Sequence, residues 1–264
     1  MAAMIRVASR LLPLLFLSAR ALAATLPDTG QTMCDNGSNV LVACTNANTG
    51  DNATYPRQDG RFGRDANAAA ATLAKIGGGP AGFDYTKIAN NGAALSASTL
   101  LGTAITDWAC TRDNVTGLTW EVKTSTNTDL RFSGHSYAWY NTDAGTNGGN
   151  AGGASAFTCN GTLPGGQCNT QAFAAAVNAM ALCTHTDWRL PTRRELQTVV
   201  DAGGSNPAIT ASYFPNTTAS IYWSSSSNVP NPASAWIVDF ANGVTNIGGK
   251  TFVSYVRLVR GEQF

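Results

Sequence analysis

The densest group of chemically capable side chains lies at residues 186–196, "TDWRLPTRREL". Its three arginines could hold an anion, and Glu195 could move a proton. The same letters also form a structural pattern, because Thr192 followed three positions later by Glu195 is the capping box of a helix. A carboxylate that caps its own helix is already engaged, so we interpret Glu195 as a structural residue.

The residues around this helix start are expected to build a corner of the core. Residues 188–191 should be extended, because Pro191 pushes the residue before it out of the helical region. Arg189 alternates with apolar neighbours and should point away from them toward an acid. The candidate partners are Asp187, Glu121 and Asp239. Arg193 and Arg194 lie in the first helical turn, where the helix dipole disfavours positive charge, so an anionic partner for them stays open.

A second stretch, "GHSYAWYN" at residues 134–141, has the composition of a sugar site. An aromatic ring can stack against the C–H face of a sugar while neighbouring amides bind its hydroxyls. The alternative is a strand whose rings pack inward, and a histidine without a partner does not indicate acid–base chemistry. The candidate binding residues are His135, Tyr137, Trp139 and Tyr140, with Asn228, Asn231, Asn246 and Lys250 expected to be exposed on later loops.

Four tryptophans beside expected strands are interpreted as core residues rather than as a binding surface. A buried indole removes on the order of 150–250 Å² from water, which makes it a strong contributor to packing. The predicted structural set is Trp120, Trp188, Trp223 and Trp236, together with Arg189, Pro191, Thr192 and Glu195.

The sequence holds no recognised catalytic motif. It has no G-x-S-x-G, no HExxH and no glycine-rich phosphate loop at a strand–helix junction. The serine run at residues 224–227 has no nearby histidine to activate it. We predict a protein that is not an enzyme, with no catalytic residue, no cofactor and no metal site.

The first 24 residues have the features of a signal peptide. Two arginines precede a short apolar run at residues 11–19, and "ALA" just after it supports cleavage near Ala23 or Ala24. No later segment is long and apolar enough to span a bilayer. The net charge of +1, with 12% charged residues, is too balanced for nucleic-acid binding. We predict an exported protein that is periplasmic, secreted or at the cell surface.

Six cysteines form an even set, and in an oxidising compartment such a set is expected to form disulfides. Six cysteines allow fifteen pairings. We favour Cys34–Cys44 and Cys159–Cys168 as local loops, which leaves Cys110–Cys183 as a long-range link. A metal site is the weaker alternative, because the chain has no CxxC pair and only two histidines.

The pattern of expected elements is α+β. Residues 25–105 are rich in turns, with one short helix through Leu73, and are predicted to be an irregular N-terminal portion. Alternation predicts a strand at 117–122. An apolar stripe of Phe173, Val177 and Met180 predicts a helix capped by Asn169 or Thr170. A second helix should run from residue 192 to Gly203-Gly204, followed by strands at 221–227, 234–243 and 250–261, the last covered on both sides.

Five motifs in order carry a resemblance to one bacterial family: "DNVTGLTWEV", "WRLPTRREL", "YWSSS", "AWIVDFANG" and "YVRLVRG". Residues 106–264 resemble the C-terminal domain of the Legionella collagen-like adhesin, the Lcl-C domain family, and residues 63–88 resemble the leader that often precedes it. The resemblance implies a C-type-lectin-like fold in which two helices flank twisted antiparallel strands. It also implies adhesion, in the named adhesin to sulfated glycosaminoglycans and often as a homotrimer.

This chain departs from that adhesin in two respects. It has no Gly-X-Y collagen segment, and its charges nearly cancel, with 17 basic against 16 acidic residues. The resemblance therefore implies only extracellular ligand binding, to a glycan or surface polymer in adhesion or biofilm, with oligomerisation left open. One alternative is a structural or protein–protein module of the envelope or of a surface appendage. The other is an oxidase similar to formylglycine-generating enzymes, which would need a copper-binding cysteine pair near the C-terminus, whereas the last cysteine is Cys183.

Overall fold

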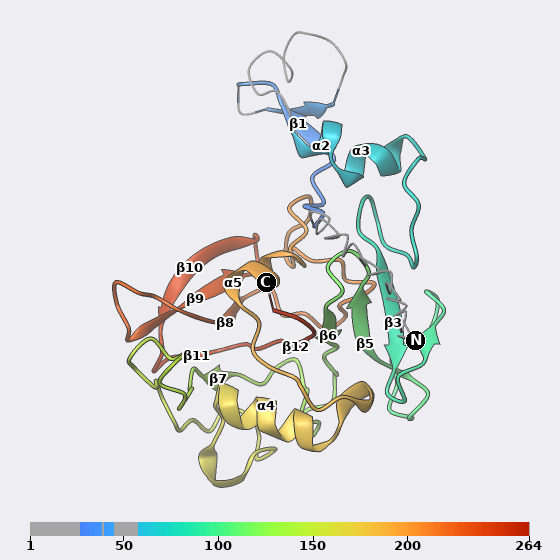
Figure 1. Cartoon of the computed structure of the whole chain (residues 1–264). Coiled ribbons are helices and arrows are strands. Elements are labelled where there is room, and N and C mark those ends of the chain that lie inside the picture. The colour runs from blue at the N-terminus through green and yellow to red at the C-terminus, as the bar shows by residue number, and fades with distance from the viewer. Residues whose placement is uncertain (1–26, 39, 45–57, 264) are drawn as a thin grey trace, which may run out of the picture.

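The computed structural model of the chain describes residues 27–38, 40–44 and 58–263 (Figure 1). The predicted signal peptide at residues 1–24 lies outside the described residues. Two larger antiparallel sheets stand beside each other, with helix α4 below them and the small elements β1, α2 and α3 at the opposite end of the molecule. The fold is mixed α+β with few helices, as predicted.

The larger sheet has five strands in the order β12-β6-β5-β3-β4. Their bounds are β3 Tyr85–Ala89, β4 Ala94–Leu95, β5 Trp108–Asp113, β6 Thr119–Glu121 and β12 Val259–Arg260. The predicted strand at 117–122 corresponds to β6. Strands β3 and β4 come from the portion predicted to be irregular, yet β3 pairs directly with β5. The boundary predicted at residue 105 therefore falls inside one sheet.

The second sheet has the order β10-β9-β8 and comes from the C-terminal third of the chain. Its strands are β8 Ile221–Ser227, β9 Ser234–Asp239 and β10 Val244–Gly249. Strand β8 matches its prediction, whereas β9 ends at Asp239. The Asn242-Gly243 dipeptide makes the turn into β10, with Gly243 at φ 78°. β10 was not predicted, because its sequence, VTNIGG, shows no apolar alternation.

The predicted continuous strand at 250–261 is wrong. It is divided between β11 Val253–Ser254, which pairs with β7 Tyr137–Ala138, and β12 in the larger sheet. Between the two, Arg257 is fully buried and donates from Nη1 to the Glu121 carbonyl oxygen at 2.6 Å. The segment's apolar run therefore reflects a crossing between sheets rather than one strand covered on both faces. A further two-stranded sheet joins β1 Met33–Asp35 and β2 Leu41–Ala43.

The helices are short, and the starts of α4 and α5 follow the predicted caps. They are α2 Asp59–Phe62, α3 Arg64–Ala69, α4 Thr170–Ala179 and α5 Arg193–Gln197, with 3-10 turns η1 Pro164–Gly166 and η2 Leu182–Thr184. The Asn169 side chain accepts from the Ala172 amide at the start of α4. Both predicted helix ends are wrong: α3 stops before Leu73 because Ala71 takes a φ of 55°, and α5 ends well before Gly203-Gly204. Met180 lies past α4 and is 46% exposed.

The predicted core tryptophans are confirmed in part. Trp120, Trp188 and Trp223 are no more than 2% exposed, divided between two buried clusters. Trp236 is only half-buried, and the Arg193 guanidinium lies 4.3 Å from its ring centre. This cation–π contact gives Arg193 a partner within the protein.

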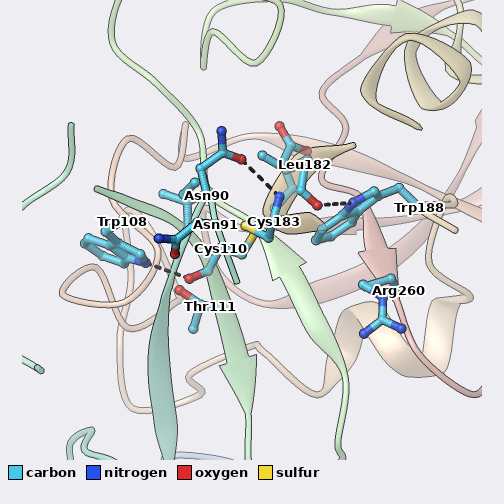
Figure 2. The surroundings of a disulfide bond; sticks show 12 residues. Asn90, Asn91, Trp108, Cys110, Thr111, Leu182, Cys183, Trp188 and Arg260 are labelled. Atoms are coloured by element: carbon cyan, nitrogen blue, oxygen red, sulfur yellow. Dashed lines mark hydrogen bonds between the residues drawn. A yellow bond between two sulfur atoms is a disulfide. The ribbon is translucent and has the colours of Figure 1, made fainter. Parts of the chain in front are cut away.

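The three disulfides join the cysteines that the sequence favours: Cys34–Cys44, Cys110–Cys183 and Cys159–Cys168. Figure 2 shows how Cys110–Cys183 ties β5 to the turn after α4. Around it the Asn90 side chain accepts from the Cys183 amide at 3.0 Å, and Trp188 Nε1 donates to the Leu182 carbonyl at 3.0 Å. The link therefore stands inside a hydrogen-bonded part of the core.

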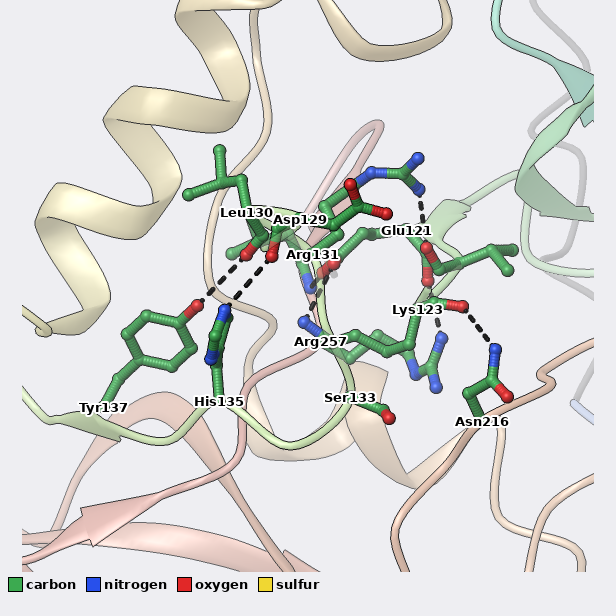
Figure 3. Close-up of polar contacts among 12 residues, drawn as sticks. Glu121, Lys123, Asp129, Leu130, Arg131, Ser133, His135, Tyr137, Asn216 and Arg257 are labelled. Atoms are coloured by element: carbon green, nitrogen blue, oxygen red, sulfur yellow. Dashed lines mark hydrogen bonds and ion pairs between the residues drawn. The ribbon is translucent and has the colours of Figure 1, made fainter. Parts of the chain in front are cut away.

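A buried charge cluster lies at the end of β6 (Figure 3). Glu121 and Lys123 form an ion pair of 2.8 Å, with both side chains almost fully buried. Arg131 Nη1 donates to the carbonyls of Ala109 and Val122 at 3.2 and 2.6 Å. Burial lowers the pKa of Lys123 to about 8, and the neighbouring Glu121 only partly opposes this shift.

Candidate functional site

Most of the aromatic stretch predicted to bind sugar is buried. His135, Tyr137 and Trp139 are 3%, 0% and 1% exposed. Figure 3 shows the side chains of His135 and Tyr137 pointing at the carbonyls of Asp129 and Leu130, with His135 Nε2 3.1 Å from the Asp129 oxygen. Burial lowers the pKa of the His135 imidazole. The burial of His135 and Tyr137 favours the inward-facing alternative over a binding role.

The loop residues predicted to be exposed divide equally. Lys250 and Asn228 are 1% and 8% exposed, so for them the prediction is wrong. Asn231 and Asn246 are exposed, but neither lines the hollow described below. Polar side chains on these loops therefore do not converge on one ligand.

Lys250 has a structural task instead. Its ammonium donates to the carbonyls of Asn147 and Asn150 at 2.7 and 2.8 Å and to Ser227 Oγ at 3.1 Å. It also lies 3.8 Å from the ring centre of Trp139. One buried cation thus fixes the Gly/Asn-rich loop onto the end of β8.

Tyr140, the fourth predicted aromatic residue, is half-buried and lines a hollow of about 490 Å³. The hollow lies where the start of the Gly/Asn-rich loop, the first turn of α4, the 188–192 corner and the end of β8 meet. Trp139, Trp188, Ala174 and Leu190 provide its apolar surface. Its hydrogen-bonding side chains are Asn141, Thr146, Thr170, Gln171, Arg189, Thr192, Ser225, Ser226, Ser227 and Gln263.

The backbone beside Tyr140 is held by the first turn of α4. Thr170 Oγ1 accepts from the Tyr140 amide and donates to its carbonyl, both at 2.9 Å. Gln171 Oε1 accepts from the Thr142 amide at 2.9 Å, and its Nε2 donates to Thr142 Oγ1 at 3.1 Å. Two side chains of one helix turn therefore set the position of the aromatic ring at the mouth of the hollow.

The opposite wall is the corner predicted from "WRLPTRREL". Glu195 is fully buried, and its carboxylate accepts from Arg189 at 2.8 and 2.7 Å and from the Thr192 amide at 2.7 Å. Thr192 Oγ1 in turn accepts from the Glu195 amide at 3.1 Å, so the predicted capping box is confirmed. Pro191 is buried, and its carbonyl accepts from the Ser225 amide at 2.7 Å, which joins the corner to β8.

The predicted partners of Arg189 are wrong, because its acid is Glu195 on the following helix turn. Asp187 pairs with Arg260 at 2.8 Å instead. The Arg189 side chain is 27% exposed and lines the hollow, and the buried Glu195 carboxylate compensates its charge. The corner is therefore both a structural element and one wall of the site.

The hollow offers hydrogen bonds rather than proton transfer. Its lining contains no Asp, Glu, His or Cys among the described residues. Ser226 Oγ accepts a hydrogen bond from the Arg193 amide at 3.1 Å. Neither the Ser225 hydroxyl nor the Ser226 hydroxyl donates a hydrogen bond to another described residue. These two hydroxyls stand in a half-buried position, ready to donate to a bound molecule.

Sequence reasoning missed most of this lining. The serine run after Trp223 was tested only for nucleophilic chemistry and Thr170 only for helix capping, and Gln171 was given no role. An available signal was the polar end of β8, where four consecutive serines follow an apolar strand start. The approach of this end to Tyr140 depends on tertiary packing and has no local signature.

The fold is a disulfide-linked α+β domain, and the hollow described above is lined by hydroxyl and amide side chains. The family model of the Lcl C-terminal domain matches residues 109–260, more than half of the chain, so the chain belongs to this family. Comparison with curated proteins and with solved structures found no match. The lectin-like arrangement and the relation to formylglycine-generating enzymes stay predictions.

Family membership indicates a surface adhesin-related module. The three disulfides and this adhesin-associated domain are consistent with an extracellular location. Within the described part of the chain, none of the helices has the length and apolar character needed to cross a membrane.

Proposed function

We propose that the protein is a non-catalytic extracellular binding module whose hollow takes an uncharged sugar residue of a glycan or surface polymer. The observation that carries this proposal is that the half-buried Tyr140 ring lines the same hollow as the hydroxyls of Ser225 and Ser226, which donate to no other described residue. A ring can cover the C–H face of a sugar, and hydroxyl and amide groups can bind its hydroxyls. The volume of about 490 Å³ lies in the range of small-molecule sites.

The electrostatics favour a neutral ligand over a sulfated one. Arg189 is the one charged side chain among the described residues of the lining, and Glu195 holds it through two hydrogen bonds. A sulfate would need unpaired cations, as in clusters of arginine that bind anionic groups. The family's adhesin is similar to this chain in sequence motifs, but the charge in this hollow supports a different ligand.

Two observations support binding without catalysis. Glycoside hydrolysis uses a pair of carboxyl groups flanking the bond, and the described lining has none. Copper chemistry of the formylglycine type would need a free cysteine pair, whereas all six cysteines are in disulfides. The side chains that remain can orient and hold a sugar.

The proposal is tested with a glycan array carrying neutral and sulfated sugars, followed by calorimetric titration of the best neutral ligand. Tyr140→Ala should weaken binding about tenfold, which corresponds to about 1.4 kcal/mol. The matched control is Phe157→Ala, an aromatic ring that is 85% exposed and outside the hollow. Folded protein that retains no neutral glycan, or equal affinity of both variants and the wild type, would overturn the proposal.

A specific observation also favours the alternative of a protein–protein module. Four apolar side chains of β10, of β11 and of the turn between them are exposed: Val244 by 55%, Ile247 by 44%, Phe252 by 71% and Val253 by 39%. Exposed apolar groups gathered on one surface often mark a protein contact. Cross-linking that captures one envelope protein, lost on Phe252→Ser and kept on Tyr140→Ala, would favour this function over glycan binding.

A further inference from the structure

Three carboxylates converge at the end of the molecule opposite α4. Asp28 precedes β1, Asp59 is the first residue of α2, and Asp65 lies in the first turn of α3. One oxygen from each lies within 4.8 Å of the others. Three segments that are separate in the sequence thus contribute one acidic group each to the same place.

Two of the three carboxylates are buried without enough donors. Asp28 and Asp65 are 5% and 2% exposed. Both oxygens of Asp28 and Oδ2 of Asp65 are buried without a hydrogen bond of good geometry from a described residue, and the approach of the Gly30 amide does not outweigh the burial that raises the pKa of Asp28. Asp65 Oδ1 alone has a donor, the Gly82 amide at 2.8 Å. A buried carboxylate with unpartnered oxygens is strongly unfavourable unless a cation or proton compensates its charge.

The nearby basic groups direct their N–H groups at carbonyl oxygens rather than at the aspartates, although the charge of Lys75 acts on Asp28 and Asp65. Arg64 Nε donates to the Gly82 carbonyl at 2.8 Å. Lys75 Nζ donates to the carbonyls of Gly79 and Ala81 at 2.9 and 2.5 Å. None of the ion pairs between described residues includes one of the three aspartates.

We propose that Asp28, Asp59 and Asp65 bind one calcium ion. Calcium takes carboxylate oxygens at about 2.3–2.6 Å, so two ligands on opposite sides of the ion are about 5 Å apart. The observed limit of 4.8 Å between the oxygens fits such a shared ion. Thr29, whose hydroxyl donates to Asp59, stands beside the site. Sites with few protein ligands in extracellular modules bind calcium at about 10⁻⁴–10⁻³ M.

The ion would fix the chain entering the domain. The Thr29 carbonyl accepts from the Ala202 amide at 2.7 Å, so the segment that carries Asp28 is already attached to the region after α5. Calcium then joins this segment to α2 and α3 through Asp59 and Asp65. This role is separate from sugar binding, because none of the three aspartates lines the hollow.

Calorimetric titration of calcium chloride into chelator-treated protein tests the proposal. One site is expected, and 10 mM calcium, an amount of roughly ten to a hundred times such a dissociation constant, should raise Tm by about 3–10 °C. Asp28→Asn and Asp65→Asn should each weaken calcium binding at least tenfold. The matched control is Glu262→Gln, an exposed acid elsewhere, which should bind calcium like the wild type.

The competing explanation is a proton shared among the carboxylates. Burial, followed by repulsion from Asp65, raises the pKa of Asp28 to about 7. If a proton alone compensates the cluster, Tm should rise on acidification from pH 8 to pH 5 and be the same with and without calcium. That result, or the absence of binding heat in folded wild-type protein, overturns the calcium site.

Discussion

Replacing Glu195 tests whether the corner serves structure or chemistry. The carboxylate is fully buried and accepts three hydrogen bonds, two from Arg189 and one from the Thr192 amide. Removing one partner of a buried ion pair costs about 3–5 kcal/mol. Because the Arg189 side chain is 27% exposed, water compensates part of its charge, and we expect a loss of about 3 kcal/mol for Glu195→Ala.

A conservative variant separates charge from capping. Glutamine serves a capping box as well as glutamate, so Glu195→Gln keeps the bond to the Thr192 amide and loses only the ionic character toward Arg189. We expect a cost of about 1–2 kcal/mol. In a double-mutant cycle with Arg189→Met, the coupling energy should be about 1.5–3 kcal/mol. Urea unfolding followed by tryptophan fluorescence measures all four proteins.

The opposite outcome is equally clear. A Glu195→Gln protein as stable as the wild type, with no coupling to Arg189, would refute the structural interpretation. If such a protein also lost its biological activity, Glu195 would have to be treated as a functional acid.

Three further predictions concern the framework. Replacing both Cys110 and Cys183 by serine removes a disulfide that joins positions 73 residues apart. The free energy of unfolding, measured by urea denaturation, should fall by about 4 kcal/mol. A loss below about 1 kcal/mol would contradict this prediction. Burial lowers the pKa of Lys123 from 10.5 to about 8, so between these values the unfolded chain binds more protons and stability should rise with pH. Thermal scans from pH 8 to about 9.5, below tyrosine ionisation, should show this rise in the wild type and a weaker one in Lys123→Met. Lys250→Met leaves the carbonyls of Asn147 and Asn150 without their donor. We therefore expect about 1–3 kcal/mol lower stability and weaker sugar binding. Unchanged sugar binding would argue against the loop as a wall of the hollow.

The features that were predicted correctly have local causes. The cap at Asn169, the capping box at Thr192 and the buried stripe of Phe173 and Val177 depend on residues within one or two turns of each other. The disulfide pairing also followed from short spacings, since two close pairs left one distant pair.

The features that were missed depend on distant partners. In β3 every second residue is buried, but one of them is Lys87, so no apolar alternation could be seen. Its ammonium lies 3.9 Å from the ring centre of Trp108 and donates to the Thr99 carbonyl at 2.7 Å. Lys250 is buried over Trp139 in the same way. A lysine is normally expected at the surface, and only the folded structure shows the ring and carbonyls that accept it.

The hollow itself was beyond sequence reasoning for the same reason. Tyr140, Gln171, Arg189 and Ser226 come from four segments that meet only in the folded domain. All four stretches had been noticed, but only Tyr140 was predicted to bind a ligand, and the other three were assigned other roles. Their convergence changes the interpretation of the corner from a support for recognition elsewhere to a wall of the candidate site.

Titration of a neutral oligosaccharide against the wild type, Tyr140→Ala and Phe157→Ala tests the central claim most directly. If the hollow recognises sugar through its ring and hydroxyls, only the tyrosine variant loses affinity, about tenfold, while its urea unfolding stays like that of the wild type. Preference for sulfated over neutral sugars, or equal affinity in all three proteins, would contradict the assignment of recognition to this hollow.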